Sequence, residues 1–161
     1  MYSKWFCRIV NEVEKSGKLT YSMYIGRYYH QIEEKGRVSL PKKFREQGTE
    51  NFVITRGLDG GLFIYPEHAW QATIQTLSEK TETKKMHRDF VRLMTNEAQE
   101  VQVDKLGRIH IPEYLRNFAH LQKDVVVIGS FSKIEIWDVN VYHSYIENLE
   151  KNAENISELI E

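Results

Sequence analysis

The sequence has 161 residues, of which 41% are apolar and 28% are charged, a balance typical of a folded globular chain. No apolar stretch approaches the ~20 residues of a membrane span, and the first ten residues are charged too early for a secretory signal. Cys7 is the only cysteine, which excludes an intrachain disulfide and favours a reducing cytoplasm.

The formal net charge of −1 conceals an uneven distribution along the chain. From Asp138 to the end, six acidic residues stand against a single base, Lys151, so the tail carries −5 and the part before it +4. Five cations fall within eleven residues, namely Lys35, Arg37, Lys42, Lys43 and Arg45. A local excess of positive charge attracts phosphate whatever the net charge, so a nucleic-acid partner is compatible with this composition.

In chain order, the predicted elements begin with a strand over residues 28–32, and the same set begins again with a strand over residues 100–103. Each first strand enters a turn closed by Gly36 or Gly107, which leads into a second strand with alternating apolar residues, VSL or IHI. Pro41 and Pro112 end these strands, because proline lacks the amide that continues a ladder and suits the first turn of a helix.

Both sets continue with a short helix and two more strands. The predicted helices are KKFREQG, ended by Gly48, and EYLRNFA. The predicted strand pairs are FVITR with LFIY and VVVIG with IEIW, joined by turns rich in Gly, Asp and Ser. When the turn glycines are aligned, Phe44 matches Leu115 and Arg45 matches Arg116. So many matches in order indicate an internal duplication rather than chance.

Helices are predicted between and after the two copies. Apolar residues recur every three or four positions from Glu67 to Thr95, with a break from Ser78 to Thr83, which predicts two helices. A further amphipathic helix with an acidic face is predicted between Val141 and Leu159. Apolar stripes of this kind are typical of packing faces, so we assign no chemistry to these helices.

The repeated turn is the main candidate for function. In the second copy, Asp104 is placed to accept hydrogen bonds from turn amides, and Gly107 supplies a positive φ. Arg108 leaves this rigid turn with a guanidinium that suits the O6/N7 edge of guanine or a phosphate, and Lys105 is a less directional phosphate contact. The alternative is that Asp104 and Arg108 merely pair and hold the turn closed. The spacing alone leaves both interpretations open.

The remaining residues form no recognisable catalytic or metal-binding motif. The six histidines have neither H-x-x-x-H nor H-E-x-x-H spacing, and no cysteine partner is suitably spaced. Walker, G-x-S-x-G and G-x-G-x-x-G motifs are absent from the sequence, and the Gly60–Gly61 pair indicates a hairpin turn. We therefore expect a non-enzymatic protein without a cofactor or a bound metal.

The two copies together resemble a known protein family. MYIGRYYHQIEEKGRVSLPKKFR with FVITRGLDGGLFIYP is similar to the opening of the MraZ family, and DKLGRIHIPEYLR with VVVIGSFSKIEIWD is similar to its second half. The resemblance runs from about Met23 to Leu149. It implies an α+β, mainly β fold in which two tandem SpoVT-AbrB-like half-barrel repeats form a pseudo-symmetric unit, with intervening and C-terminal helices.

The resemblance also implies an order of domains. The expected segments are an N-terminal extension (1–22), the first repeat (27–69), a helical connector (70–97), the second repeat (98–141) and an acidic C-terminal helix (142–161). The extension has no counterpart in the family pattern. Because MYIGRYYHQI resembles the usual family beginning, a start at Met23 is an alternative to a lineage-specific arm, and the mass of the native protein would distinguish them.

The family's D-x-x-x-R signature corresponds to Asp104 and Arg108 in the second copy. In the first copy Arg37 matches but Glu33 replaces the aspartate, so this turn is expected to be capped less tightly. Arg27 stands where the family often has a basic residue. The expected DNA-binding residues are Lys35, Gly36, Arg37, Lys105, Gly107, Arg108 and Arg27, with Glu33 and Asp104 as turn-stabilising residues.

The resemblance implies a function as well. The resemblance implies a cytoplasmic oligomer that forms rings. It further implies binding to short G-containing direct repeats in the promoter of the division and cell-wall gene cluster, mainly as a repressor. We therefore expect a nucleoid-associated, sequence-specific transcriptional regulator, whose partners are double-stranded DNA and further copies of itself in a ring-like homo-oligomer, without a membrane partner. The alternative is an antitoxin-like or interaction-only member of the same fold, in which the basic turns serve assembly.

Overall fold

The computed structural model describes residues 23–47, 49–78 and 85–153. The predicted N-terminal extension, Gly48, most of the predicted break between the connector helices and the end of the acidic tail lie outside these ranges. The described residues up to Tyr142 form one compact unit, and those from His143 onward belong to another. Within the described ranges, the structure contains no helix with the length and apolar character that crossing a membrane requires.

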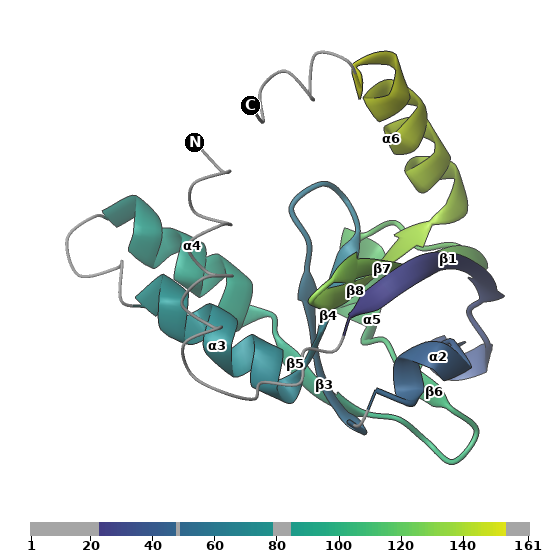
Figure 1. Cartoon of the computed structure of the whole chain (residues 1–161), viewed down its shortest axis with the longest axis horizontal. Coiled ribbons are helices and arrows are strands. Elements are labelled where there is room, and N and C mark those ends of the chain that lie inside the picture. The colour runs from purple at the N-terminus through teal and green to yellow at the C-terminus, as the bar shows by residue number, and fades with distance from the viewer. Residues whose placement is uncertain (1–22, 48, 79–84, 154–161) are drawn as a thin grey trace. The chain divides into compact units, whose positions relative to one another are not determined.

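The first repeat begins with a strand that is longer than predicted. β1 spans Tyr24–Gln31 instead of residues 28–32, because it pairs along its whole length with β7 (Asp124–Phe131). Local alternation did not reveal its first half, where Ile25, Gly26 and Arg27 are all exposed. The other elements of this repeat are a 3-10 turn at Glu34–Gly36, β2 (Arg37–Ser39), α2 (Lys42–Arg45), β3 (Asn51–Arg56) and β4 (Leu62–Pro66) (Figure 1).

The second repeat has the same elements in the same order. They are β5 (Gln99–Gln102), β6 (Arg108–His110), α5 (Glu113–Phe118), β7 and β8 (Lys133–Asp138). Both short helices follow a proline whose carbonyl oxygen accepts a hydrogen bond from the helix: Phe44 N donates to Pro41 O at 2.9 Å, and Leu115 N donates to Pro112 O at 3.1 Å. The predicted duplication and the predicted strands are therefore confirmed.

The strand pairing exchanges the first strands between the two repeats. In the six-stranded antiparallel sheet, with the order β1-β7-β8-β4-β3-β5, β1 of the first repeat pairs with β7 of the second. In return, β5 of the second repeat pairs with β3 of the first. β4 pairs with β8 in the middle of the sheet, and β2 pairs with β6 in a separate two-stranded ribbon. When each strand is replaced by its equivalent in the other repeat (β1 by β5, β3 by β7 and β4 by β8), the order read from one edge becomes the order read from the other. The two repeats are therefore related by a pseudo-twofold axis and share one sheet.

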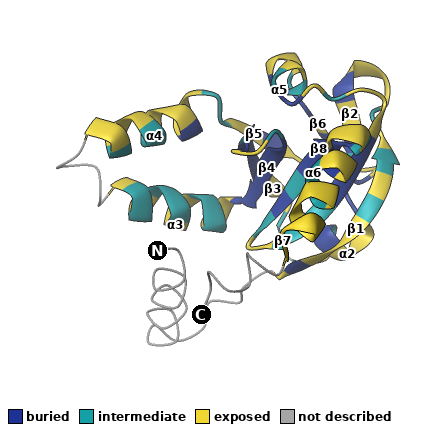
Figure 2. Cartoon of the chain, turned by 90° about the horizontal axis from the view of Figure 1, so that it is seen from above, coloured by how far each residue is buried: buried dark blue, intermediate teal, exposed yellow. Residues whose placement is uncertain are grey.

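The main core lies between this sheet and the layer formed by the ribbon, α2 and α5. Strands β3 and β4 of this sheet are buried along almost their whole length, whereas β1 is largely exposed, as Figure 2 shows. Phe44 on α2 is fully buried and contacts the rings of Tyr24 and Tyr28 edge-on, with ring centres 5.3 Å apart in both pairs. The equivalent residue on α5, Leu115, is buried in the same cluster. Because each fully buried apolar side chain contributes about 1.5–3 kcal/mol, this shared cluster holds the two repeats together.

The connector forms two helices, as predicted. α3 (Glu67–Ser78) and α4 (Lys85–Asn96) lie side by side (Figure 1). A second, smaller cluster joins them to the sheet face opposite the main core, and it consists of Phe63, Tyr65 and Met94 with Ala69, Trp70 and Phe90. Thr55 Oγ1 on β3 also donates to Met94 O at 2.8 Å. The expectation that these apolar stripes are packing faces is consistent with both contacts.

The last described helix, α6, spans Val139–Lys151. The buried carboxylate of Asp138 begins it, because Oδ1 accepts a hydrogen bond from Asn140 N at 3.0 Å. The ring of Trp137 packs against Tyr142 with ring centres 6.1 Å apart. Further along, Lys151 pairs with Glu147 at 2.8 Å. The predicted C-terminal helix is thus confirmed as far as Lys151.

Candidate nucleic-acid interface

The two repeated turns are closed by the same pattern of backbone hydrogen bonds. With the donor first, these bonds are Glu33 N to Arg37 O (2.7 Å), Gly36 N to Glu33 O (3.1 Å), Asp104 N to Arg108 O (2.8 Å) and Gly107 N to Asp104 O (2.8 Å). Each turn therefore begins at the acidic residue and ends at the arginine of the repeat. The turns share this hydrogen-bond pattern, but their backbones differ at the residue before the glycine, where Lys35 is left-handed (φ 64°) and Leu106 is not.

The ribbon of β2 and β6 holds the turns next to each other. Arg37 lies opposite His110 and Ser39 lies opposite Arg108, on either side of the buried pair of Val38 and Ile109. Beyond the ribbon, each repeat donates a hydrogen bond to the turn glycine of the other, from Leu40 N to Gly107 O (3.0 Å) and from Ile111 N to Gly36 O (2.8 Å). Two turns that are far apart in the sequence thus form one surface, which backbone hydrogen bonds between the repeats hold together.

Both turns require glycine. Gly36 has a φ of +74° and Gly107 a φ of +78°, a region that side chains with a Cβ rarely adopt. An arginine from the neighbouring repeat lies over each glycine: a Cβ on Gly107 would lie 2.5 Å from Cζ of Arg45, and one on Gly36 would lie 2.9 Å from Nε of Arg116. The predicted positive φ of Gly107 is therefore confirmed, and close packing adds a second reason for glycine.

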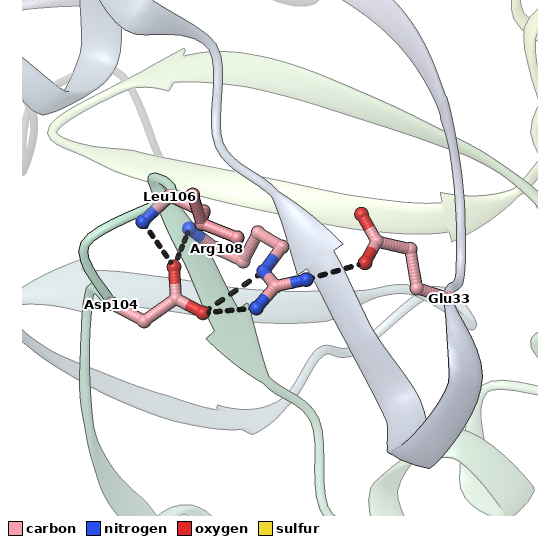
Figure 3. Close-up of polar contacts among 4 residues, drawn as sticks. All are labelled: Glu33, Asp104, Leu106 and Arg108. Carbon is pink, nitrogen blue, oxygen red and sulfur yellow. Dashed lines mark hydrogen bonds and ion pairs between the residues drawn. The ribbon is translucent and has the colours of Figure 1, made fainter.

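Asp104 caps the second turn through both carboxylate oxygens (Figure 3). Oδ1 accepts hydrogen bonds from Leu106 N and Arg108 N, both at 2.9 Å. Oδ2 accepts from Nε and Nη2 of Arg108, at 2.9 and 2.8 Å. The hydrogen bonds from the Arg108 side chain and then its amide lower the pKa of Asp104 from 3.8 to about 2. The predicted capping and the alternative interpretation, an Asp104–Arg108 pair, thus both occur.

Glu33 does not behave as its position predicts. It makes no side-chain hydrogen bond that caps its own turn. Instead, its Oε2 accepts a hydrogen bond from Nη1 of Arg108, in the other repeat, at 2.7 Å (Figure 3). The extra methylene of glutamate carries the carboxylate away from its own turn toward the partner turn. We call Glu33, Arg108 and Asp104 the cross-repeat triad. Hydrogen bonds to Asp104 and then to Glu33 raise the pKa of Arg108 above its usual value.

The other predicted cations of the turns are exposed. Within the described part of the chain, the side chains of Lys35, Arg37 and Lys105 make no hydrogen bond or ion pair. The two lysines occupy different places: Lys35 directly precedes its glycine, with φ 64° and ψ 21°, whereas Lys105 precedes its glycine by two positions. The residue equivalent to Lys35 is Leu106, which is 70% exposed. The turns therefore present different side chains although they share one pattern of backbone hydrogen bonds.

Arg27 does not lie with the exposed cations of the two turns. It lies in the middle of β1, where Tyr24 and Tyr28 point into the main core, and alternation places Arg27 on the opposite face. Its guanidinium lies 5.9 Å from the ring centre of Tyr29 and 6.0 Å from that of Tyr142. A cation between two aromatic rings is a stable packing arrangement. The assignment of Arg27 to DNA binding stays a prediction, and it is separate from the turns.

Sequence reasoning missed two residues of this surface. His110 is exposed and lies opposite Arg37 in the ribbon, and the alternation of β6 would have placed it on the same face as Arg108. Leu106 is apolar, so a pattern defined by cations does not include it. Among the described residues, no group of three or more His, Cys, Asp or Glu is arranged to hold a metal ion.

Comparison with known proteins identifies the family. A family model described as "MraZ protein, putative antitoxin-like" matches residues 23–93 and again residues 94–159. A protein of Pediococcus pentosaceus named "Transcriptional regulator MraZ" is 43% identical over 136 residues, which are 84% of this chain and 95% of that protein. Proteins of the same name from Halothermothrix orenii and Natranaerobius thermophilus are 42% and 41% identical, covering 86% of this chain and 97% and 96% of their own lengths. The two model matches correspond to the two repeats, and the chain belongs to the MraZ family.

Proposed function

We propose that this protein is a sequence-specific DNA-binding transcriptional regulator that acts as a repressor. Its proposed targets are closely spaced, short G-containing repeats upstream of the division and cell-wall gene cluster, and its proposed location is the cytoplasm, in association with the nucleoid. Relatives that are 41–43% identical over most of their length carry the name of a transcriptional regulator. We keep the domain boundaries predicted from the sequence as part of this proposal.

One observation carries the proposal: two rigid turns lie side by side on a ribbon and present exposed cations. Lys35, Arg37 and Lys105 have no carboxylate partner within the described residues. Their positive charges are therefore available to phosphate, and binding is expected to release counterions. The major groove of B-DNA is wide enough to admit a two-stranded ribbon, and an arginine presented there can donate two hydrogen bonds to guanine.

We further propose that a ring-like homo-oligomer sets several such ribbons next to one another. DNA with tandem sites then binds neighbouring subunits, and linkage raises the affinity by ~10²–10⁴ over a single contact where the geometry allows. A promoter occupied in this way is closed to polymerase without a catalytic step. No cofactor or membrane takes part in this mechanism.

The experiment is a band shift with the DNA upstream of the protein's own gene. Arg37→Ala is expected to weaken binding by ~1–3 kcal/mol if the side chain reads a base. Arg92→Ala is the matched control, because it removes one exposed arginine from α4, away from the turns. Wild-type binding is expected to weaken steeply with salt and to fall sharply for an isolated site. Unchanged affinity in Arg37→Ala, or a flat salt response, would contradict the proposal.

The second candidate is an antitoxin-like or interaction-only protein, in which the same turns serve assembly or a protein partner. The description of the matching family model as antitoxin-like favours keeping it. The two candidates differ in one result. A regulator selects one upstream region from a mixture of genomic fragments, whereas an interaction-only protein selects none and loses self-association when Lys35 and Arg37 are replaced.

A further inference from the structure

We propose that the two equivalent arginines of the repeats have different roles: Arg37 contacts DNA, and Arg108 is a positioning residue that ties the two turns together through Glu33. This inference rests on the proposed function and deepens it. It predicts that a pseudo-symmetric chain binds DNA through an asymmetric surface.

The guanidinium of Arg108 is fully occupied by carboxylates. Nε and Nη2 donate to Asp104, and Nη1 donates to Glu33, so every nitrogen of the group is bound to a carboxylate. The side chain is only 17% exposed. To reach a base or a phosphate, Arg108 would have to leave both carboxylates. The triad has two negative charges and one positive charge, so it does not attract phosphate in its resting arrangement.

Arg37 differs from Arg108 in both exposure and bonding. The residue is exposed, and its side chain has no hydrogen bond or ion pair within the described part of the chain. The acidic residue of its own turn, Glu33, is already bound to Arg108. Arg37 therefore keeps its full charge and all five N–H donors for a ligand. The replacement of Asp by Glu in the first turn is the change that frees it.

Arg108 is connected to the start of β2, and so to Arg37, through Glu33. Glu33 N donates to Arg37 O at 2.7 Å, so Glu33 is the residue on which the start of β2 is anchored. Arg108 connects the carboxylate of Glu33 to Asp104, which in turn caps the second turn. A continuous path of hydrogen bonds thus runs from one turn to the other. A fork of donors that bridges two carboxylates suits arginine and cannot be reproduced by lysine.

The consequence concerns the direction in which DNA is read. A twofold-symmetric surface binds a palindrome equally well in both directions. Here one turn presents Lys35 and Arg37, whereas the other presents Lys105 and Leu106 beside a bound Arg108. An asymmetric surface of this kind suits a site with a single direction, and copies of such a site in one orientation are direct repeats.

The test measures the salt dependence of promoter binding by the full-length protein in two variants. Arg37→Gln removes the proposed contact. The double variant Glu33→Gln/Arg108→Gln removes one negative and one positive charge, so the triad keeps its net charge of −1 while losing the bridge. Each phosphate contact contributes about 0.9 to the slope of log affinity against log salt. Urea unfolding of each variant shows whether it remains folded.

We expect Arg37→Gln to lower this slope by about 0.9, in contrast to the double variant, which keeps the wild-type slope and binds several-fold more weakly. Arg108→Lys is expected to resemble the double variant, because the three donors of lysine share one nitrogen and do not form the planar fork that spans both carboxylates. A slope that falls equally in Arg37→Gln and the double variant would overturn the inference and leave the regulator proposal intact. If the wild-type protein selects no upstream DNA, the proposed function fails and this inference fails with it.

Discussion

Replacing the turn glycines with alanine should destabilise the protein unequally, and the structure indicates by how much. Both glycines have a left-handed backbone conformation, and a Cβ in this conformation costs about 1–2 kcal/mol. At Gly107 the new methyl meets the end of the Arg45 side chain, which can move away. This movement gives up the hydrogen bond from Arg45 Nε to Leu40 O, worth about 0.5–1.5 kcal/mol. We expect Gly107→Ala to lower the free energy of unfolding by about 2–3 kcal/mol.

Gly36→Ala should cost more, because its methyl meets backbone as well as a side chain. The Cβ would lie 2.9 Å from Ile111 O, and the same residue donates the 2.8 Å hydrogen bond from Ile111 N to Gly36 O. Relief of the clash requires the two repeats to separate locally at this point. We therefore expect a loss of about 2–5 kcal/mol, the sum of about 1–2 kcal/mol of strain and about 1–3 kcal/mol for a buried backbone group left unpaired.

The assay is urea unfolding at a fixed protein concentration, so that self-association affects all variants equally. Lys105→Ala is the matched control: it lies in the same kind of turn, is exposed, and should change the free energy of unfolding by less than about 0.5 kcal/mol. The reasoning would be refuted if Gly36→Ala proved no more destabilising than Gly107→Ala, or if either variant matched the control.

Three further predictions test the core, the triad and the connector. Phe44→Ala empties a fully buried site and should lower the free energy of unfolding by about 3–5 kcal/mol in the same assay; a loss under about 1 kcal/mol would contradict the packing. The lowered pKa of Asp104 means that its stabilising effect is complete above the ordinary value of 3.8 and disappears as the pH falls through about 2, which NMR titration of its carboxyl carbon measures; a midpoint near 4 would exclude the pairing with the arginine. Arg56 donates to both carboxylate oxygens of Glu97, at 2.9 and 2.5 Å, and lies 4.4 Å from the ring centre of Phe118, so Arg56→Lys should cost about 1–2 kcal/mol by thermal unfolding. A double-mutant cycle with Glu97→Gln that shows no coupling would contradict this last prediction.

Much of the fold follows from local patterns. The turns were predictable because a glycine at positive φ, an acidic residue at the strand end and a following proline each restrict the backbone over a few residues. Alternation identified most strands, and helical spacing identified α3 and α4. The start of β1 was not predictable, because its pairing with β7 depends on a segment about a hundred positions away, and its own first residues are largely exposed.

The partner of Arg108 shows where local reasoning ends. Its pairing with Asp104, four positions away, follows from the turn. Its bond to Glu33, 75 positions away, exists only because the strands of the two repeats are exchanged and the ribbon brings the turns together. From the sequence alone, Glu33 was therefore interpreted as a weaker cap than Asp104. In the structure its carboxylate instead binds Arg108 of the other repeat.

By itself, the sequence determined that this protein is duplicated, that each copy carries a rigid turn with basic residues, and that it resembles the MraZ family, which the comparisons then confirmed. Those properties depend on residues that are close together in the sequence, so they can be recognised without knowledge of the folded structure. Only the tertiary structure decided that the repeats share one sheet and one core, and that Arg108 is bound to two carboxylates whereas Arg37 has no partner among the described residues. The physical reason is that hydrogen bonds between carboxylates and a guanidinium depend on distances in space, and strand exchange sets these distances across the whole length of the chain.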